Sequence, residues 1–423
     1  MVTDIFMSLI LLALMFYSFT RPHVAACMAV WINLVKPQNT SFAFLAGQPL
    51  SLITTALFFL VLIFNFNKLR VPKSKFYHFS MIGFMFWITV ASFLGEFQNL
   101  VWLKYDFVIK TLIFSYFIPF TLTKREHVEM FIWVCVASFG LFISMAGLKT
   151  LLGGGGYGVS LIGIGGFMYS EGSTLATLAV CLLPLIFCLR ASSQIAKNWK
   201  TFKWLSLAFS ALALLTVVGT QARTGLVALA AFIGLLMKKH KVNLKVIVAI
   251  CVIPVVIYAV APQSWFARMS SIGDSTTSEK SAIGRLVVWR WTIDYALERP
   301  FFGGGFYSYN ANAGVLHQYQ RGQEITISQR SGKAFHNIFF EVLGETGFGG
   351  LFFFSSIILH TLRSNKKTRS IKGTESKDIS SALSQSILIY CVGGFFVGIA
   401  FYPWIYYIYG VSIALNGIEE DNE

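Results

Sequence analysis

The sequence predicts an all-helical protein that crosses a lipid bilayer many times. Of its 423 residues, 55% are hydrophobic and only 13% are charged, about half the charged share of a soluble protein. Apolar runs of 15 to 22 residues recur along the chain, and about twenty helical residues cross a bilayer. Because backbone groups in lipid must be satisfied within the segment, these runs are expected to be helices rather than isolated strands.

The apolar runs set the expected spans in order. In the first half they lie near 5–19, 24–36, 50–66, 78–94, 104–121, 127–148 and 174–190. In the second half they lie near 204–220, 223–238, 245–260, 336–361, 380–400 and 402–416. Two of them, 24–36 and 223–238, are short for a full crossing, so we predict twelve or thirteen transmembrane helices. The first run is interpreted as a retained helix rather than a cleaved leader.

The net charge of +15 is distributed in a way that indicates membrane topology and not nucleic-acid binding. Twenty of the 34 Lys and Arg residues fall in five short segments: 68–75, 124–125, 190–203, 238–245 and 363–377. Alternating spans place all five on one side, which the positive-inside rule makes cytoplasmic. Loops 37–49, 95–103, 149–173 and 261–335 then face outward, as does the N-terminus if there are thirteen spans.

One outer segment, 261–335, is too long for a simple connection and is expected to be functional. It divides the chain into N-terminal spans (1–260), a large outer loop (261–335) and C-terminal spans (336–423), within one integral membrane domain. Within the loop, residues 284–299 carry Leu286, Trp289, Ile293 and Leu297 at helical spacing. With its two tryptophans, this helix is expected to lie in the membrane interface.

Two other patterns give no cofactor site. Gly153, Gly155 and Gly158 fit G-x-G-x-x-G, but no strand or βαβ unit surrounds them, so we interpret 153–166 as a flexible outer loop. The six cysteines all fall in expected spans, which argues against a disulfide framework or a thiolate metal site. We therefore expect no metal and no cofactor.

His336 is the strongest candidate for chemistry because it stands where the outer loop meets a long apolar run. A helix N-terminus and nearby Arg or Lys disfavour the imidazolium form, and a neutral imidazole can act as a general base. Asn337 or Glu341 could orient the ring. The alternative is a purely structural role for His336 as a packed, hydrogen-bonded side chain. His317 is a second candidate for the base. Glu341 and Glu345 share one helix face and could hold water or the histidine, or serve a proton-coupled transporter.

Cationic side chains on the outer side favour an anionic ligand. The 261–335 loop holds eight basic residues against five acids, the reverse of what topology alone favours. Arg223 lies in a tight turn between two spans and is either a phosphate clamp or an interfacial arginine at a helix end. Arg285 begins the 284–299 helix, where the helix N-terminus also attracts phosphate. Arg290, expected to pair with Asp294, and Arg321 are further candidate ligand-binding residues.

Three stretches together resemble a known family: GTQARTGLVAL around Arg223, GRLVVWRWTIDYALERPFFGGGF, and FHNIFFEVLGETGFGGLFF. They are similar to the core signature of the O-antigen ligase and polymerase superfamily, which includes lipid A-core ligases, O-antigen polymerases and bacterial protein O-oligosaccharyltransferases. The resemblance covers about 210–360. The opening DIFMSLILLALMFYSFTRPHVAACMAVWINLVKPQ more loosely resembles O-glycosylation ligases encoded with exosortase systems.

The resemblance implies a metal-independent, inverting glycosyltransferase at the periplasmic face of the bacterial inner membrane. The implied donor is an undecaprenyl diphosphate-linked glycan, and the implied acceptor is lipid A-core or another hydroxyl. Arg223 and Arg285 would bind the diphosphate, and His336 would activate the acceptor hydroxyl. Within the superfamily, a polymerase or a protein O-oligosaccharyltransferase is the alternative. A transporter or flippase for lipid-linked glycans is the alternative from a different class.

Overall fold

The computed structural model is built of α-helices and short 3₁₀ turns, and it describes all residues except 1, 40, 42, 157–168, 195, 197–198, 240–257, 259–260, 262, 271–274, 321–330, 372–375 and 423. No strand occurs in the part of the chain described, so the predicted all-α class is confirmed. The N-terminal helices are α1 (Val2–Ser18), α2 (Pro22–Val35), α3 (Leu50–Phe64), α4 (Lys75–Phe93), α5 (Gln98–Thr121) and α6 (Arg125–Leu151). They are followed by α7 (Gly172–Ser192), α8 (Phe202–Gly219) and α9 (Arg223–Lys239).

The remaining elements are those of the outer segment and the C-terminal part. The outer segment contains α11 (Gln263–Ser270), α12 (Ser275–Glu298), η3 (Ser308–Asn312) and η4 (Leu316–Tyr319). The chain ends with α13 (Ile338–Ser370), α14 (Lys377–Gly394) and α15 (Pro403–Asn422). The expected span at 245–260 lies, except for Tyr258, outside the described residues, and every other expected span coincides with a helix.

Several described helices can cross a bilayer by length and composition. Five meet both requirements: α4, α6, α7, α8 and α13, while α1 and α3 are apolar but shorter. The protein is thus a multi-pass membrane protein. The total of twelve or thirteen crossings stays a prediction, because several of the remaining helices are short or carry charges near their ends.

The bundle has one end where the basic loops gather, which we call the basic end. The backbone N–H of Arg70, in the α3–α4 connection, donates to the carbonyl of Phe120 at the end of α5 (2.9 Å). Arg125, Arg190, Lys200 and Lys203, from three other stretches of chain, line one cavity together with Asp378 at the start of α14. Arg70 and Lys73 line a second cavity together with Arg363 and Lys367. Described residues of four of the five basic segments, 68–75, 124–125, 190–203 and 363–377, thus lie around these two cavities, while a shared membrane side for all five stays a prediction.

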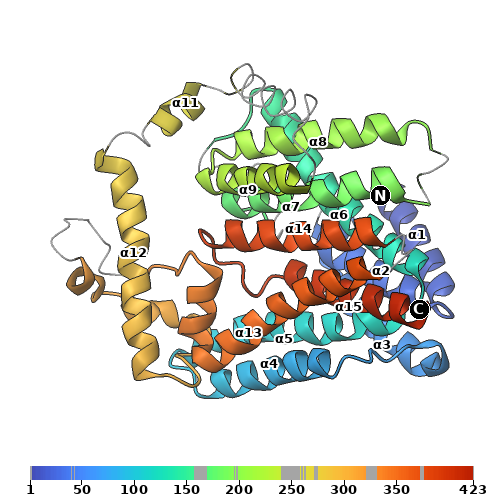
Figure 1. Ribbon diagram of the computed structural model, residues 1–423, viewed down its shortest axis with the longest axis horizontal. Coiled ribbons are helices and arrows are strands. Elements are labelled where there is room, and N and C mark those ends of the chain that lie inside the picture. The colour runs from blue at the N-terminus through green and yellow to red at the C-terminus, as the bar shows by residue number, and fades with distance from the viewer. Residues whose placement is uncertain are drawn as a thin grey trace.

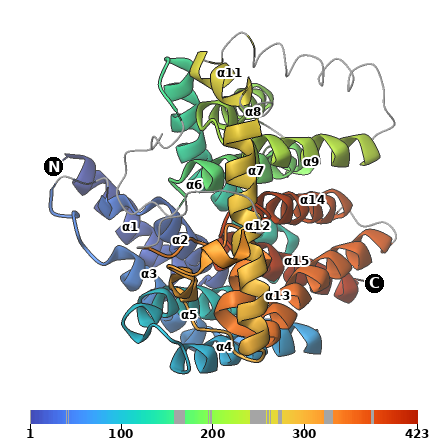
Figure 2. The same cartoon turned by 90° about the vertical axis from the view of Figure 1, so that its left-hand side faces the viewer.

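Helix α12 lies across the opposite end of the bundle, roughly perpendicular to α13, α14 and α15 (Figure 1). Turned by 90°, the same helix passes in front of the ends of these helices (Figure 2). Its inner face forms a small core with the rest of the outer segment, consisting of Val287, Val288, Trp291, Tyr295, Leu316 and Phe335. The predicted stripe lies mostly on the outer face: Leu286 and Ile293 are each 44% exposed and Leu297 is 62% exposed.

Helix α13 is interrupted at Gly347, whose φ of 68° and ψ of −170° are not helical. The expected span near 336–361 therefore begins two residues later, continues to Ser370 and is bent one third of the way along. A bend frees backbone groups that lipid cannot satisfy, so partners must be supplied by protein. They come from the glycine-rich turn after α12.

The turn at 300–305 supplies those partners. The N–H groups of Gly304 and Gly305 donate to the carbonyls of Gly344 and Glu345, both at 3.0 Å. In return, the N–H of Phe348 donates to the carbonyl of Pro300 (2.8 Å). A Cβ on Gly303, at φ 63°, would lie 2.6 Å from the Gly347 nitrogen, so only glycine allows this approach.

Candidate functional site

His336 occupies the last residue but one before α13, at the end of the bundle covered by α12. Its φ of 49° is left-handed, a conformation that costs a non-glycine residue about 1–2 kcal/mol. The neighbours on both sides are fixed: Trp289 donates to the carbonyl of Phe335 (2.9 Å), and Asn337 caps α13 by accepting from the N–H of Phe339 (2.8 Å). Backbone strain of this kind is often held at functional sites.

The surroundings of His336 lower its pKa and so favour the neutral imidazole. Burial is the largest cause of a lowered pKa, and the positive charges of Arg285 and Lys333 lower it further, while Glu171 and Glu341 act in the opposite direction. The helix N-terminus and nearby cations were the causes expected from the sequence. The cations are present, but burial has the larger effect. Asn337, a candidate to orient the ring, caps α13 with its side-chain oxygen, and its side-chain nitrogen is buried without a hydrogen-bond partner among the residues described.

Arg285 and Lys333 form a cationic pair beside His336. Arg285 lies 5.7 Å above the ring of Phe396, in the connection between α14 and α15. The Lys333 ammonium lies against Gly284, where a Cβ would come within 2.3 Å of the nitrogen. Burial and then Arg285 lower the pKa of Lys333. The sequence argument counted Lys333 among the basic residues of the loop but did not select it.

The backbone of Lys333 is held by Asn312, which accepts from its N–H and donates to its carbonyl, both at 2.8 Å. This pair of hydrogen bonds fixes the chain just before His336. The placement of the lysine is therefore set by the folded outer segment and not by the spanning helices. The spacing of residues in the sequence does not predict this position of Lys333.

Arg223 is the first residue of α9 and lies at the His336 end of the bundle. Gly225, two residues on, packs against Ala176 near the start of α7, and Gly172 packs against Thr220. Glu171, immediately before α7, caps that helix through the N–H groups of Ser173 (3.0 Å) and Thr174 (2.7 Å). Arg223 thus stands near the start of α7, from which Glu171 acts on His336.

Of the other two candidate arginines, Arg290 has its described contact outside this cluster. Arg290 donates to the carbonyl of Tyr319 at 3.5 Å, and its expected partner Asp294 interacts with the hydroxyl of the same tyrosine. Arg321 lies outside the described residues. The rival base His317 is exposed in η4. Of the predicted residues, the structure brings together His336 and Arg285.

A buried ion-pair cluster lies below His336 on α13. The ammonium of Lys104 donates to Glu341 at 2.8 Å and to both oxygens of Glu345 at 2.7 and 2.9 Å. The second Glu341 oxygen accepts from the N–H of Ala400 (3.0 Å), and Glu345 accepts from the N–H of Tyr307 (3.0 Å). The two carboxylates therefore join α13 to α5, to the outer segment and to the α14–α15 connection.

Lys104 was not selected from the sequence, although a signal was available. It stands at the start of an expected span, and a charged group at membrane depth is costly unless it has a function or a partner. From the sequence, Glu341 and Glu345 were candidates to hold water or the histidine, or to serve a proton-coupled transporter. In the structure both carboxylates accept hydrogen bonds from the Lys104 ammonium. In the part of the chain described, no group of three or more His, Cys, Asp or Glu side chains is arranged to bind a metal.

These features define a class of protein. It is an all-helical, multi-pass membrane protein with a folded outer segment and, at one end, a histidine beside two cationic side chains. Residues 207–355 match the O-antigen ligase family (Wzy_C), and residues 2–194 match a family of unknown function (DUF5935). The chain therefore contains an O-antigen ligase domain preceded by a region of unassigned function. No curated protein matches it significantly. Arg223, Arg285, Lys333 and His336 all lie within the O-antigen ligase match, whereas Lys104 lies within the N-terminal one.

Proposed function

We propose that this protein is a glycosyltransferase that moves a glycan from a polyprenyl diphosphate donor to a hydroxyl acceptor at the His336 end of the membrane bundle. The observation that carries the proposal is the half-buried His336 beside Arg285 and Lys333, in a chain with an O-antigen ligase domain. A neutral base and fixed cations are the two groups that such a transfer needs.

The mechanism divides the work between these groups. The acceptor oxygen forms a bond to the anomeric carbon of the glycan and gives its proton to a ring nitrogen of His336. The bond between the anomeric carbon and the diphosphate oxygen breaks, and the electron pair leaves with the polyprenyl diphosphate. Arg285 and Lys333, with Arg223 from the adjacent helix start, offset the negative charge on that leaving group. Attack opposite the leaving group inverts the anomeric centre.

The same cations serve two purposes in this proposal. With no diphosphate bound, burial and then the charges of Arg285 and Lys333 lower the pKa of His336, which favours the neutral ring that can accept a proton. A bound diphosphate would offset their charge and raise the pKa of His336, which increases its affinity for the acceptor proton. Donor binding therefore strengthens the base just when the acceptor is to be activated.

The donor we propose is an undecaprenyl diphosphate-linked glycan, and the favoured acceptor is lipid A-core, at the periplasmic face of the bacterial inner membrane. Family membership and the basic loops at the opposite end of the bundle support this orientation. The same site could extend a growing glycan or modify a protein hydroxyl, so the acceptor decides among ligase, polymerase and oligosaccharyltransferase.

The direct test is transfer in proteoliposomes that contain purified protein, lipid-linked glycan and lipid A-core. A joined product that disappears with His336→Asn is expected, and release of undecaprenyl diphosphate should match product formation. Transfer to a protein or to a second glycan, with none to lipid A-core, would replace the favoured acceptor. Movement of intact donor across the bilayer without any bond cleavage would overturn the proposal in favour of a flippase.

A further inference from the structure

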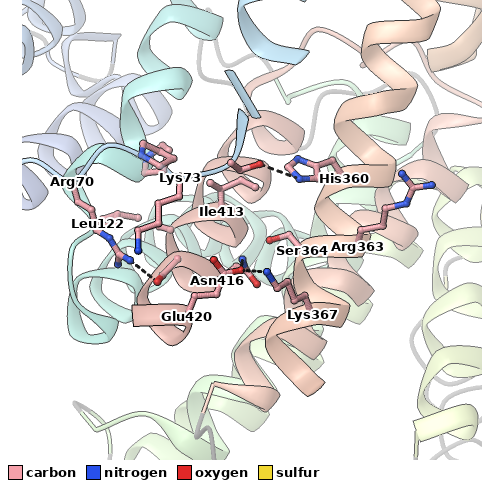
Figure 3. A pocket seen from close by; sticks show the side chains of 15 residues that line it. Arg70, Lys73, Leu122, His360, Arg363, Ser364, Lys367, Ile413, Asn416 and Glu420 are labelled. Atoms are coloured by element: carbon pink, nitrogen blue, oxygen red, sulfur yellow. Dashed lines mark hydrogen bonds and ion pairs between the residues drawn. The ribbon is translucent and has the colours of Figure 1, made fainter. Parts of the chain in front are cut away.

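A cavity of about 310 Å³ lies near the basic end of the bundle, far along α13 from His336. The α3–α4 connection, the second half of α13 and the end of α15 meet around it. Arg70 and Lys73 approach from one side and His360 and Lys367 from the other (Figure 3). Nothing in the proposed glycan transfer uses these residues.

The cavity is lined by more positive than negative charge. Its lining contains the cations Arg70, Lys73, Arg363 and Lys367 and one carboxylate, Glu420. With the adjacent Asp421 included, four positive charges stand against two negative ones, a net charge of +2. An anion is the ligand that this balance favours.

Each of the two carboxylates pairs with an exposed lysine, and Asp421 also pairs with Arg70, whose side chain is 23% exposed. Lys73 pairs with Asp421 at 2.6 Å, and their side chains are 70% and 40% exposed. Lys367, 62% exposed, pairs with Glu420 at 2.5 Å. Exposed pairs of this kind contribute little free energy, so an incoming anion can take over the lysines at small cost.

The remaining lining contains both neutral polar groups and an apolar wall. Ser74 and His360 are within 3.3 Å of each other, and His360 also bonds the Tyr409 hydroxyl at 2.7 Å. The apolar wall consists of Pro119, Leu122, Ile413 and Ala414. A ligand with a charged head and an apolar continuation fits both parts of this lining.

The position of the cavity, at the ends of apolar helices, agrees with a lipid headgroup as the ligand. Ser74 is the N-cap of α4, and α4 and α13 are both long and apolar enough to cross a bilayer. The cavity therefore stands beside the ends of membrane-spanning helices, where basic pockets between helices bind lipid phosphates. We propose that it binds the phosphate group of an anionic phospholipid.

The test compares two double variants of the full-length protein by native mass spectrometry from nanodiscs. Lys73→Gln with Lys367→Gln removes two lining cations. The matched control, Lys75→Gln with Lys366→Gln, removes two exposed charges that are close by in sequence but do not line the cavity. Each cation that directly contacts the lipid phosphate is expected to contribute about 1 kcal/mol to binding, about fivefold in affinity.

The expected result is a stoichiometric phosphatidylglycerol adduct that phosphatidylcholine does not replace. The lining variant should lose it by about tenfold or more, and the control by about twofold or less. Asp421→Asn frees Arg70 and Lys73 and should tighten binding, a gain that misfolding cannot imitate. Equal losses in the two double variants, or equal binding of the two lipids, would overturn the proposal.

Free phosphate is separated from lipid by a second arm. Inorganic phosphate is titrated into the protein in a zwitterionic detergent while the thermal unfolding midpoint is followed. Little stabilisation by phosphate alongside strong stabilisation by phosphatidylglycerol supports a lipid site. Equal stabilisation by both ligands, lost only in the lining variant, would identify a site for soluble phosphate and sink the lipid assignment.

Discussion

The ammonium of Lys104 donates hydrogen bonds to both carboxylate oxygens of Glu345, although 241 residues separate the two. Lys104 belongs to the N-terminal region and Glu345 to the O-antigen ligase domain. Glu345 is only 1% exposed, so this contact is a charged link between the two matched regions inside the membrane bundle. Removing one partner leaves buried charge without compensation.

Lys104→Met is therefore expected to destabilise the fold by about 3–5 kcal/mol, the usual cost of breaking a buried pair. Thermal unfolding in detergent, followed by intrinsic fluorescence, measures the effect. The control is Lys110→Met, since Lys110 pairs with Asp106 at 2.6 Å and both side chains are 63% exposed. Adding Glu345→Gln to Lys104→Met should restore part of the lost stability. Unchanged unfolding of Lys104→Met would show that the cluster has no structural role.

His336→Asn should abolish glycan transfer while retaining the fold. Asparagine tolerates the left-handed φ of 49° better than most residues, so this variant separates the loss of the base from backbone strain. His336→Ala should lose transfer as well and be less stable than His336→Asn by about 1 kcal/mol. Transfer rates and unfolding midpoints of both variants provide the check. Substantial transfer by either variant would remove His336 from the role of base.

Lys333→Gln should shift the acidic limb of the pH profile of transfer to higher pH. Burial, Arg285 and Lys333 lower the pKa of His336 in that order of size, so loss of Lys333 lets the pKa rise. The base is active when neutral, and a raised pKa means that it is protonated at a higher pH. The measurement is kcat/KM against pH in the wild type and the variant. A limb that stays in place, or moves to lower pH, would contradict this electrostatic role.

The outer face of α12 should contact lipid. Its exposed apolar residues, Leu286, Ile293 and Leu297, lie on a helix that crosses the end of the bundle (Figure 1). Spin labels at Leu297→Cys and Glu298→Cys, adjacent positions that are both exposed, compare two faces of the helix. The label at 297 should be relaxed more by oxygen, and the label at 298 more by a water-soluble nickel complex. Equal accessibility at both positions would place α12 away from the interface.

Gly303→Ala should damage the bend of α13. The added methyl would lie 2.6 Å from the Gly347 nitrogen, and the backbone of Gly303 has a φ of 63° that alanine disfavours. Lower stability and lower transfer activity are both expected. Gly234→Ala is a suitable control, because a Cβ there meets no heavy atom within 4 Å. Equal stability of the two variants would mean that the turn can retreat from α13.

The helices could be predicted from the sequence because each long apolar run must satisfy its backbone internally. The break in α13 could not, since Gly347 is one of several glycines in that stretch and its conformation is set by the turn at 300–305. The orientation of α12 also could not be predicted from the sequence. Its 3.6-residue pattern was evident, but two faces carry apolar residues, and only packing shows that Val288 and Trp291 point inward.

The candidate site also contains some residues that could be predicted from the sequence and others that could not. His336 stood out because it joins a polar loop to an apolar run, and Arg285 because it opens an amphipathic helix. The position of Lys333 is set by its hydrogen bonds to Asn312. Lys104 lies on α5, more than 200 residues before its partners on α13. Long-range contacts of this kind leave no local pattern in the chain. The sequence could rank the residues adjacent to His336 but not those that other elements bring to it.

The turn at 300–305 replaces the hydrogen bonds that α13 loses at Gly347, and this has a consequence for protein engineering. Suppose that the first half of α13, with His336 before it, is grafted into a related protein. The carbonyls of Gly344 and Glu345 would then lack partners unless the turn at 300–305 of this protein were grafted with it. Exchange of acceptor or donor specificity between family members should therefore succeed when residues 300–307 and 336–348 are moved as one unit, and fail when either stretch is moved alone.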